Sequence, residues 1–315
     1  MQRRTFLSAG LAMSLAACAP RGGAGGGGIL KVGSQKGGAR ALVLASGVLE
    51  DAPYKVEWSE FAAAQPLIEA ISAGAVDVGA VGDAPFLFAY AGGAPIRAVQ
   101  ASRASGGGAG TQILVPARSP IATAAQLRGK RIATGRGSIG HYVLLRVLEQ
   151  AGVKASDAQI IFLSPGDAKA AFSSGAIDAW ATWGPFVALA KADGARSLAD
   201  GKGILSGYGF EVSSVKAIAG KRPQLEDFLR RLARAKRWVG DHRAEYAAVL
   251  AKETGLAPEI ASYVVNQTRG VPVPIDAAVV AELARTLEGF RSAGAIGAAP
   301  DLAQAFDPSF NIALS

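Results

Sequence analysis

The 315-residue sequence predicts an α/β protein with two similar lobes. Three observations predict this class: an internal repeat offset by about 100 residues, a strand, glycine turn and helix in each copy, and a half-hydrophobic, 18% charged composition. This composition can form a core, which excludes a disordered chain, and no collagen-like glycine period is present. At roughly 100 to 200 residues per domain, the length fits two lobes or one large domain.

The charge balance gives a formal net charge of +8, from 33 Lys and Arg against 25 Asp and Glu. Such an excess could indicate a nucleic-acid or membrane-surface partner. The positive charges are scattered, so we prefer a soluble basic protein that binds no nucleic acid. One Cys and two His exclude a Cys/His zinc site, and we predict neither metal nor cofactor.

The first 17 residues predict an export signal. Arg3 and Arg4 precede an apolar stretch that ends at Ala17, about half the length of a membrane-spanning helix. The arginine pair, followed by Phe6 and Leu7, resembles a twin-arginine signal. Two arginines would also serve the general secretory route, so both routes stay open.

A lipid-attachment site is predicted directly after this signal. Residues 15–18 resemble the lipobox of bacterial lipoproteins, in which the cysteine becomes the lipidated first residue after cleavage. Cys18 is the one cysteine of the chain, which favours lipidation over a cleavage site with an unrelated cysteine. Residues 18–28 predict a Gly-rich tether. Cleavage before Cys18 would remove Arg3 and Arg4 and leave a net charge of +6.

The internal repeat consists of four pairs of matching segments. They are residues 31–37 with 131–137, residues 43–44 with 143–144, residues 74–77 with 175–178, and residues 84–86 with 184–186. The last pair is slipped by one residue. Chance matching in an Ala/Gly-rich chain is the alternative, but the matched segments also share a structural role, which favours a duplication.

Each copy begins with a short apolar strand, a glycine turn and a helix. In the first copy, Val32 marks the strand, and residues 41–49 have the three-to-four spacing of a packed helix. In the second copy, Ile132 marks the strand, residues 135–140 the turn and residues 142–148 the helix. The two copies therefore predict two α/β units.

The second part of each copy starts a helix at a proline. Pro85 and Pro185 mark these starts, because the first helical N–H groups have no intrahelical partner for a proline to remove. Two further strands are predicted at residues 54–59, where apolar and polar residues alternate, and at residues 158–163. Because strands alternate with helices, we predict parallel sheets.

These elements predict a cleft that binds an anion. In open α/β sheets, ligands bind beyond the carboxyl ends of the strands. Two such lobes facing each other would direct four helix N-termini, near Gly38, Pro85, Ser138 and Pro185, into one cleft. Each terminus carries about half a positive charge and unpaired N–H donors, so the cleft should prefer an anion.

Six segments carry a resemblance to a known family: residues 35–37, 82–85, 130–134, 137–142, 163–168 and 178–186. In order and spacing they resemble the solute-binding proteins of ABC importers for aliphatic sulfonates, a group that includes taurine and nitrate binders, over residues 29–310. The resemblance implies a bilobed periplasmic-binding-protein fold, type II-like, with two Rossmann-like lobes joined by a hinge. It also implies a non-catalytic periplasmic protein that delivers a sulfonate-like anion to an ABC permease and its ATPase. Together with the lipobox, we predict a monomer that is held to a membrane by the lipid on Cys18.

After residue 210 the alternation of strands and helices ends. Apolar residues between Leu225 and Trp238 repeat at helical spacing, and four arginines lie mostly on the other face, which we interpret as a solvated face or a permease contact. These arginines are Arg230, Arg231, Arg234 and Arg237. Helices at residues 241–253, 258–267 and 276–293 are predicted to pack back on the first lobe.

The chain is predicted to cross between the lobes twice, near residues 112–116 and 207–212, and two crossovers make a hinge. The predicted organisation is a signal, a tether, a first lobe in two parts and a second lobe. Their bounds are residues 1–17, residues 18–28, residues 29–112 with 210–315, and residues 113–209.

Nine residues are predicted to bind the ligand: Gln35, Gly82, Asp83, Ala84, Gly137, Ser138, His141, Trp183 and Gly184. Gly137 and Ser138 would donate to the anion, although Ser138 can equally cap its helix. His141 would add a donor one turn later, with helix packing as the alternative. Trp183 would wall the organic tail of the ligand, with burial in the core as the alternative for it and for Trp180.

Three charged residues near the predicted cleft have less direct roles. Asp83 would repel an anion, so its side chain is predicted to cap a helix or hold a turn. Lys36 and Arg136 occupy matching turns, and we interpret both as solvated rather than as partners of the anion.

The chain departs from the family pattern at three places. A tyrosine is common where Ser34 stands, a threonine or second proline around Ala84, and Asp-Pro-Tyr at residues 184–186. Each change removes a polar side-chain group from a presumed cleft position. We therefore predict an aliphatic or aryl sulfonate with a hydrophobic tail, rather than taurine, whose ammonium needs a carboxylate.

Other functions are kept as alternatives. One is a binding protein for nitrate, taurine or a pyrimidine precursor. Another is an enzyme resembling thiamine-pyrimidine synthases, but these use a reactive His and Cys-rich segments, and Cys18 lies outside the predicted fold. A ligand-sensing domain would need an output domain or membrane helix, and the sequence shows neither. We therefore predict no catalytic residues.

Overall fold

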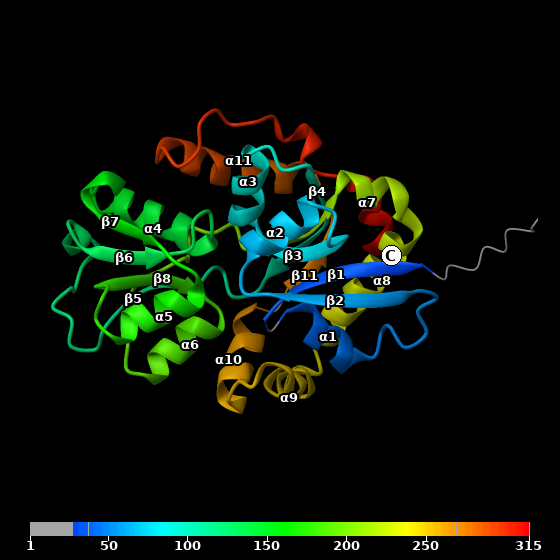
Figure 1. Ribbon diagram of the computed structural model, residues 1–315, viewed down its shortest axis with the longest axis horizontal. Coiled ribbons are helices and arrows are strands. Elements are labelled where there is room, and N and C mark those ends of the chain that lie inside the picture. The colour runs from blue at the N-terminus through cyan, green and yellow to red at the C-terminus, as the bar shows by residue number, and fades with distance from the viewer. Residues whose placement is uncertain (1–27, 37, 269, 315) are drawn as a thin grey trace, which may run out of the picture.

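Two sheets covered by helices form two lobes side by side (Figure 1). The computed structural model describes residues 28–36, 38–268 and 270–314. The predicted signal and the lipidation site Cys18 lie outside the described residues. The expectation of a bilobed α/β fold is confirmed.

The first sheet has six strands in the order β11-β4-β10-β3-β1-β2. Their bounds are β1 (Ile29–Gln35), β2 (Lys55–Phe61), β3 (Val78–Gly82), β4 (Ile96–Ala104), β10 (Tyr208–Ser214) and β11 (Gly270–Val273). β1 runs parallel to β2 and β3, whereas β10 is antiparallel to both β3 and β4. β11 adds an antiparallel edge strand beside β4.

The second sheet has five strands in the order β7-β6-β8-β5-β9. Their bounds are β5 (Thr111–Val115), β6 (Arg131–Thr134), β7 (Gln159–Phe162), β8 (Ala179–Trp183) and β9 (Arg196–Asp200). The same connectivity, β2-β1-β3-β10-β4, occurs in the first sheet. Parallel pairing is limited to β1, β2 and β3 in the first sheet and to β6, β7 and β8 in the second. The expectation of parallel sheets is wrong for the other strands of both sheets. β10 reaches the first sheet from the second lobe, β5 reaches the second sheet from the first lobe, and each runs antiparallel to its neighbours.

Helices of the two repeat copies cover both sheets. They are α1 (Ala39–Ser46), α2 (Ala64–Ser72), α3 (Asp83–Ala91), α4 (Ile139–Gln150), α5 (Pro165–Ser173) and α6 (Pro185–Ala192). Two of them start at side-chain caps, where the hydroxyls of Ser138 and Ser164 accept from the amides of His141 and Asp167. Pro185 is the first residue of α6, as predicted. Among the described residues, 3₁₀ turns lie at Ala124–Leu127, Ala155–Asp157, Leu302–Gln304 and Pro308–Leu314.

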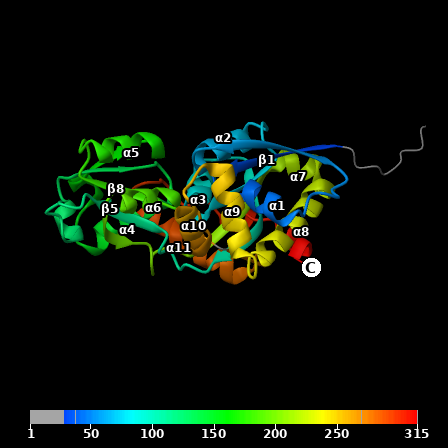
Figure 2. The ribbon, with the colours of Figure 1, turned by 90° about the horizontal axis from the view of Figure 1, so that it is seen from below.

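The C-terminal helices pack mainly on the first lobe. They are α7 (Val215–Gly220), α8 (Arg222–Trp238), α9 (Arg243–Thr254), α10 (Pro258–Thr268) and α11 (Ala277–Ser292). Leu225, Phe228 and Leu232 of α8 are fully buried with Leu30 of β1 in the first core. Figure 2 shows α10 next to α6 of the second lobe, which it contacts, and α11 contacts both α3 and α4. These two helices therefore bridge the lobes.

One arginine of α8 is not on the exposed face where the sequence placed it. Arg231 is 9% exposed, and its Nε lies 2.6 Å from a carboxylate oxygen of Asp227. A second guanidinium nitrogen pairs with Asp51, and the same nitrogen donates to the carbonyl of Val48 at 2.8 Å. Arg231 therefore ties α8 to the loop after α1.

The lobes are joined by residues 105–110 and residues 201–207, which connect β4 to β5 and β9 to β10. The sequence placed the crossovers at residues 112–116 and 207–212, but most of these residues lie inside β5 and β10. The two connections touch each other at glycines. A Cβ atom on Gly108, where φ is 91°, would lie 2.3 Å from the carbonyl oxygen of Gly201.

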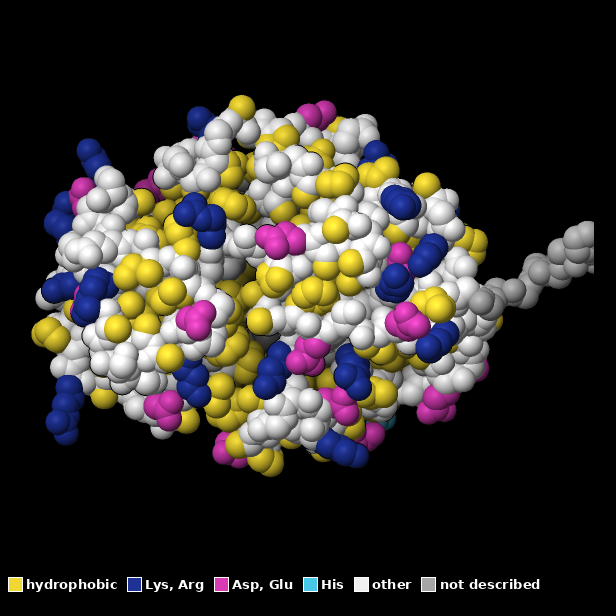
Figure 3. Space-filling view, in the orientation of Figure 1, with side chains coloured by type: hydrophobic (Ala, Val, Ile, Leu, Met, Phe, Trp, Pro, Cys, Tyr) yellow, Lys and Arg dark blue, Asp and Glu magenta, His cyan; other side chains and the backbone are white. Residues whose placement is uncertain are grey.

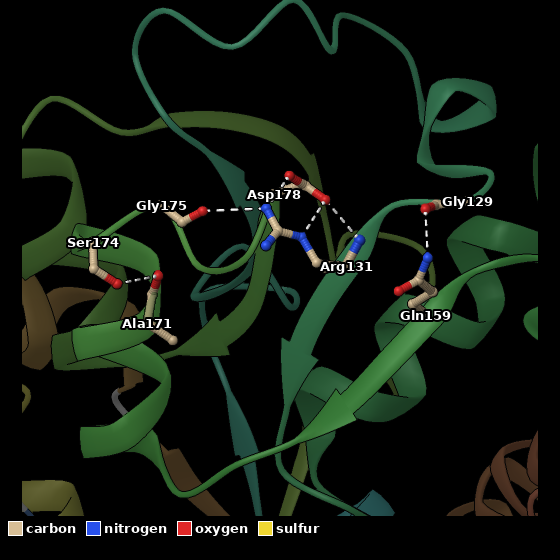
Figure 4. A network of polar contacts seen from close by, with 7 residues as sticks. All are labelled: Gly129, Arg131, Gln159, Ala171, Ser174, Gly175 and Asp178. Carbon is tan, nitrogen blue, oxygen red and sulfur yellow. Dashed lines mark hydrogen bonds and ion pairs between the residues drawn. The ribbon is translucent and has the colours of Figure 1, made fainter.

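The internal repeat is visible in matching hydrogen bonds. In the first lobe the amide of Lys31 donates to Asp77 Oδ2 at 2.7 Å, and the amide of Asp77 donates back to the Lys31 carbonyl at 2.8 Å. In the second lobe the amide of Arg131 donates to Asp178 Oδ2 at 2.8 Å (Figure 4). The amide of Asp178 donates back to the Arg131 carbonyl at 2.8 Å. This shared geometry supports a duplication over a chance match.

Candidate ligand-binding site

A cavity of about 390 Å³ lies between the lobes and is lined by residues of both. The molecular surface is hollowed where the lobes meet (Figure 3). Most lining side chains are apolar, including Leu42, Leu205, Leu232 and Phe210. A mostly apolar cavity of this size with a few polar groups is typical of a small-molecule site.

Three helices begin at the cavity wall. The lining includes Gly38 and Ala39 at α1, Gly82 and Asp83 at α3, and Gly184 and Pro185 at α6. The fourth helix named by the sequence, α4, also contributes its first residue, Ile139, but its N-cap Ser138 is not among the residues that line the cavity. The first amides of a helix lack intrahelical partners and carry partial positive charge, so these starts favour an anion in the cavity.

Five of the nine predicted site residues line the cavity: Gln35, Gly82, Asp83, Trp183 and Gly184. The side-chain amide of Gln35 donates to the carbonyl of Ala80 at 2.9 Å, which holds the side chain against β3. Trp183 is partly exposed at the end of β8, where it can meet a ligand tail. Trp180 is buried between Phe172 and Phe186 in the core of the second lobe, the alternative that the sequence left open.

Asp83 lies at the cavity wall, but its carboxylate already has protein partners. Oδ1 accepts from the amide of Ala84 at 2.7 Å, and Oδ2 accepts from the hydroxyl of Ser206. The side chain is 2% exposed, and this burial raises the pKa of the Asp83 carboxyl. The carboxylate thus holds the start of α3 to the second connection between the lobes.

The other four predicted residues, Ala84, Gly137, Ser138 and His141, are not among the residues that line the cavity. Ala84 is buried against Tyr142 and Phe290. The Ser138 hydroxyl accepts from the amide of His141 at 3.1 Å and so caps α4. A ligand contact by these residues stays a prediction.

His141 is packed rather than directed at the cavity. Its Nδ1 accepts from the amide of Gly137 at 3.1 Å, and its ring centroid lies 5.0 Å from that of Phe162. Burial, with Arg136 nearby, lowers the pKa of His141 to about 4, so the imidazole is neutral at pH 7. The helix-packing alternative fits this geometry. The Arg136 guanidinium itself stacks over Phe162 at 3.9 Å.

The two lobes touch closely beside the cavity. A Cβ atom on Gly137 would lie 2.4 Å from Cδ1 of Phe88, and one on Gly82 would lie 2.9 Å from Cγ2 of Ile139. Each pair joins one lobe to the other, so both glycines are needed for this approach. The lobes are therefore in direct contact at α3 and α4.

Sequence reasoning missed the polar residues that the first lobe contributes to the cavity. They are Ser102, Tyr208, Glu211, Lys236, Tyr246 and Gln267. Glu211 interrupts the apolar run of β10 between Phe210 and Val212, and Lys236 follows Leu232 by one turn on the buried face of α8. A charged residue inside a buried strand, or on the buried face of a helix, is the signal that would have found them.

Within the described ranges, the structure brings together no group of three or more metal-ligating side chains. No helix in the same ranges is both long and apolar enough to cross a membrane.

The fold and the cavity define a two-lobed solute-binding protein, and comparison with known proteins gives its family. Residues 47–242 match the family model described as NMT1/THI5 like. A putative aliphatic sulfonates-binding protein of Escherichia coli K12 is 35% identical over 266 residues, which cover 83% of each chain. The chain belongs to the NMT1/THI5-like family, and its resemblance to aliphatic-sulfonate-binding proteins is confirmed.

Solved structures agree with this assignment. The alkanesulfonate-binding protein SsuA from Xanthomonas axonopodis pv. citri, bound to MOPS, is 34% identical with a TM-score of 0.82, covering 89% of this chain and 98% of that one. The periplasmic aliphatic sulphonate binding protein SsuA from Escherichia coli is 31% identical with a TM-score of 0.76, covering 89% and 92%. The expected type of periplasmic binding fold is confirmed.

Proposed function

We propose that this protein is the substrate-binding component of an ABC importer. It captures a small organic anion, an aliphatic or aryl sulfonate, between its lobes and delivers it to a membrane permease. One observation carries the proposal: three helix starts from both lobes converge on one largely apolar cavity. The sulfonate-binding relatives support the same class of ligand.

The proposed mechanism needs no covalent step. Backbone amides near Gly38, Gly82 and Gly184 hold the oxygens of the anion, while Trp183 and the apolar lining contact its tail. Gln35 and Asp83 line the same end of the cavity, Asp83 as a positioning residue. Ligand contacts by Ala84, Gly137, Ser138 and His141 remain part of the proposal. In this structure Ala84, Gly137 and His141 pack where α3 meets α4, and Ser138 caps α4. The ligand favours closure by as much as it binds the closed form better than the open form.

The volume of the cavity indicates the size of the ligand. A volume of about 390 Å³ lies in the range of drug-sized ligands and exceeds what nitrate would need. The relative from Xanthomonas was solved with MOPS, a sulfonate with a ring at the far end of its chain. A tail of several carbon atoms or a ring therefore fits this cavity better than a bare anion does.

Ligand titration tests the function. Isothermal calorimetry with butanesulfonate, benzenesulfonate and nitrate should give binding of both sulfonates and none of nitrate. Pentanoate is the control for the headgroup, and it should bind more weakly because a carboxylate offers fewer oxygens to the converging amides. NMR of the recovered ligand should show it unchanged. Absence of sulfonate binding, or conversion of the ligand, would refute the proposal.

The cellular location is proposed from the first residues and from the periplasmic relatives. The mature protein begins at a lipidated Cys18 and stays at a membrane of the bacterial cell envelope, as a monomer beside the permease and its ATPase. Export uses the twin-arginine or the general secretory route. Labelled fatty acid should be incorporated into the wild type but not into Cys18→Ser, and the variant should become soluble in the periplasm. Equal labelling of both would contradict lipidation at this position.

A further inference from the structure

A buried ion pair lines the cavity on the side of the first lobe. Lys236 Nζ lies 3.0 Å from Glu211 Oε1, and the same nitrogen lies 3.5 Å from the hydroxyl of Ser102. The Glu211 side chain is 2% exposed and the Lys236 side chain 14% exposed. Both residues line the cavity. The pair comes from β10 and α8, neither of which contributes to the helix starts.

The position of this pair suits the far end of a ligand. Glu211 pairs with Ala80 on β3, two residues before Gly82 at the start of α3. At about 3.3 Å per residue, this is an offset of about 7 Å along the strand. A short carbon chain would therefore separate an anionic group at the helix starts from a group that reaches the ion pair.

Burying this ion pair is energetically unfavourable, which indicates that the pair has a function. Removing two charges from water costs several kcal/mol per ion, and the attraction between Glu211 and Lys236 offsets this cost only in part. An alkyl tail alone would be served better by aliphatic side chains. Among the described residues, the bonded partners of the Lys236 ammonium are Glu211 and Ser102, so one of its three donors remains for a ligand. The carboxylate of Glu211 likewise retains acceptor sites.

The neutrality of the pair selects the kind of group that it can bind. A ligand ammonium would meet Lys236, and a ligand carboxylate would meet Glu211, so either charge encounters repulsion. A hydroxyl suits both partners, because it can donate to Glu211 and accept from Lys236. We propose that the Glu211–Lys236 pair is a second subsite that recognises a hydroxyl group on the tail of the sulfonate.

The proposal rests on the proposed function, since the sulfonate places the tail, and four ligands of equal chain length test it. They are butanesulfonate and its ω-hydroxy, ω-amino and ω-carboxy derivatives, measured by calorimetry with the wild type. The ω-hydroxy ligand should bind about tenfold more tightly than butanesulfonate, since a hydrogen bond to a charged group contributes at least that factor. The ω-amino and ω-carboxy ligands should bind more weakly than the ω-hydroxy ligand.

Paired variants test the subsite itself. Glu211→Leu combined with Lys236→Met removes both charges at similar volume, a change that buried ion pairs often tolerate. In this double variant butanesulfonate should bind at least as tightly as the ω-hydroxy ligand, which reverses the preference. Lys36→Met is the control. Lys36 also lines the cavity, but it is exposed and lies in the turn after β1, away from β10 and α8 in the sequence. It should leave the preference for the hydroxyl unchanged.

The outcomes separate the subsite from the function. Binding of butanesulfonate without a preference for the hydroxyl overturns the subsite and leaves the proposed function standing. Tightest binding of the ω-amino or ω-carboxy ligand also overturns it. Binding of no sulfonate at all refutes the proposed function instead. If circular dichroism shows that the double variant does not fold, the titrations of the wild type with the four ligands still test the subsite.

Discussion

The buried carboxylate of Asp83 accepts a hydrogen bond from the hydroxyl of Ser206, and this links the first turn of α3 to a connection between the lobes. The same hydroxyl accepts from the amide of Tyr208 at 3.0 Å, where β10 begins. An acidic side chain is thus held at the wall of a cavity proposed to bind anions. Its position links α3 to the connection between the lobes, and its ionised form would repel an anionic ligand.

Replacing Asp83 by Asn should therefore stabilise the protein at neutral pH. Burial raises the pKa of Asp83 in the folded state, so the folded state holds its proton more firmly than the unfolded state does. The stability contributed by the proton is present below the unfolded pKa and is lost as the pH rises through the folded pKa. Asp83→Asn should raise the melting temperature at pH 7 more than at pH 3, and should bind sulfonates several-fold more tightly.

The control for this prediction is Ser206→Ala, which keeps the charge but removes its hydroxyl partner. An unpaired buried charge costs more than a paired one, so this variant should melt below the wild type at pH 7. Thermal unfolding of the three proteins from pH 3 to pH 8 provides the comparison. A lower melting temperature for Asp83→Asn than for Ser206→Ala at pH 7 would contradict the prediction.

The neutral imidazole of His141 should make the protein sensitive to mild acid. Its pKa falls to about 4 in the folded state, below the ordinary value of 6.5. The unfolded state then binds the proton first, so stability is complete above pH 6.5 and is lost as the pH falls towards 4. At 1.36 kcal/mol per pKa unit, the loss amounts to about 3 kcal/mol.

His141→Asn keeps an acceptor for the amide of Gly137 without a titrating group. Urea unfolding of this variant should show a shallower loss of stability between pH 6.5 and pH 4 than the wild type. Carboxylates contribute equally to both proteins, so the difference between the two curves isolates the imidazole. Parallel curves would show that His141 is not buried as described.

The sequence predicts local features well because each depends on few neighbouring residues. The starts of α3 and α6 follow from Pro85 and Pro185, and the duplication follows from residues matched at one offset. Trp183 lines the cavity because the end of a parallel strand points to the ligand edge of a sheet.

The remaining part of the site depends on contacts that join distant segments. Glu211 and Lys236 meet because β10 returns antiparallel from the other lobe and α8 packs against the sheet, and no local spacing encodes this. The sequence places His141 correctly in the first turn of α4. The direction of its side chain, however, is set by Phe88, Phe162 and Phe290 on three other elements. Motif reasoning places such residues near the site without fixing which way they face.

The repeated aspartates should differ in their effect on stability. Asp77 is 6% exposed, and it pairs with Lys221 at 2.7 Å while accepting from the Lys31 amide. Asp178 makes the matching contact to Arg131, but its side chain is 30% exposed. Asp77→Ala should cost about 2 kcal/mol, because it removes the carboxylate partner of the partly buried Lys221 ammonium, which keeps its bond to the Ile29 carbonyl, and removes the acceptor of the Lys31 amide.

The matched change Asp178→Ala should cost about 1 kcal/mol, since water can reach the groups that it leaves. Chemical unfolding of both variants measures the two losses. Losses of equal size would show that burial does not distinguish the two copies of the repeat.

Closure of the lobes should depend on the absence of a side chain at Gly137. An alanine there would place its Cβ 2.4 Å from Phe88 in the opposite lobe, at a φ of 67°. Gly175→Ala is the matched control, because its φ is 74° and nothing lies within 4 Å of the added atom. Both variants should lose about 1 kcal/mol of stability from the left-handed backbone. Gly137→Ala alone should weaken sulfonate binding, by about tenfold, because the closed form becomes less populated.

Adding Phe88→Leu to Gly137→Ala should recover much of the lost affinity, since the smaller side chain makes room for the new methyl group at the contact between the lobes. Calorimetry gives the affinities, and small-angle X-ray scattering should show a larger radius of gyration for Gly137→Ala than for Gly175→Ala when a sulfonate is present. Equal affinities for the two alanine variants would mean that the contact between α4 and α3 is not part of the ligand-bound state.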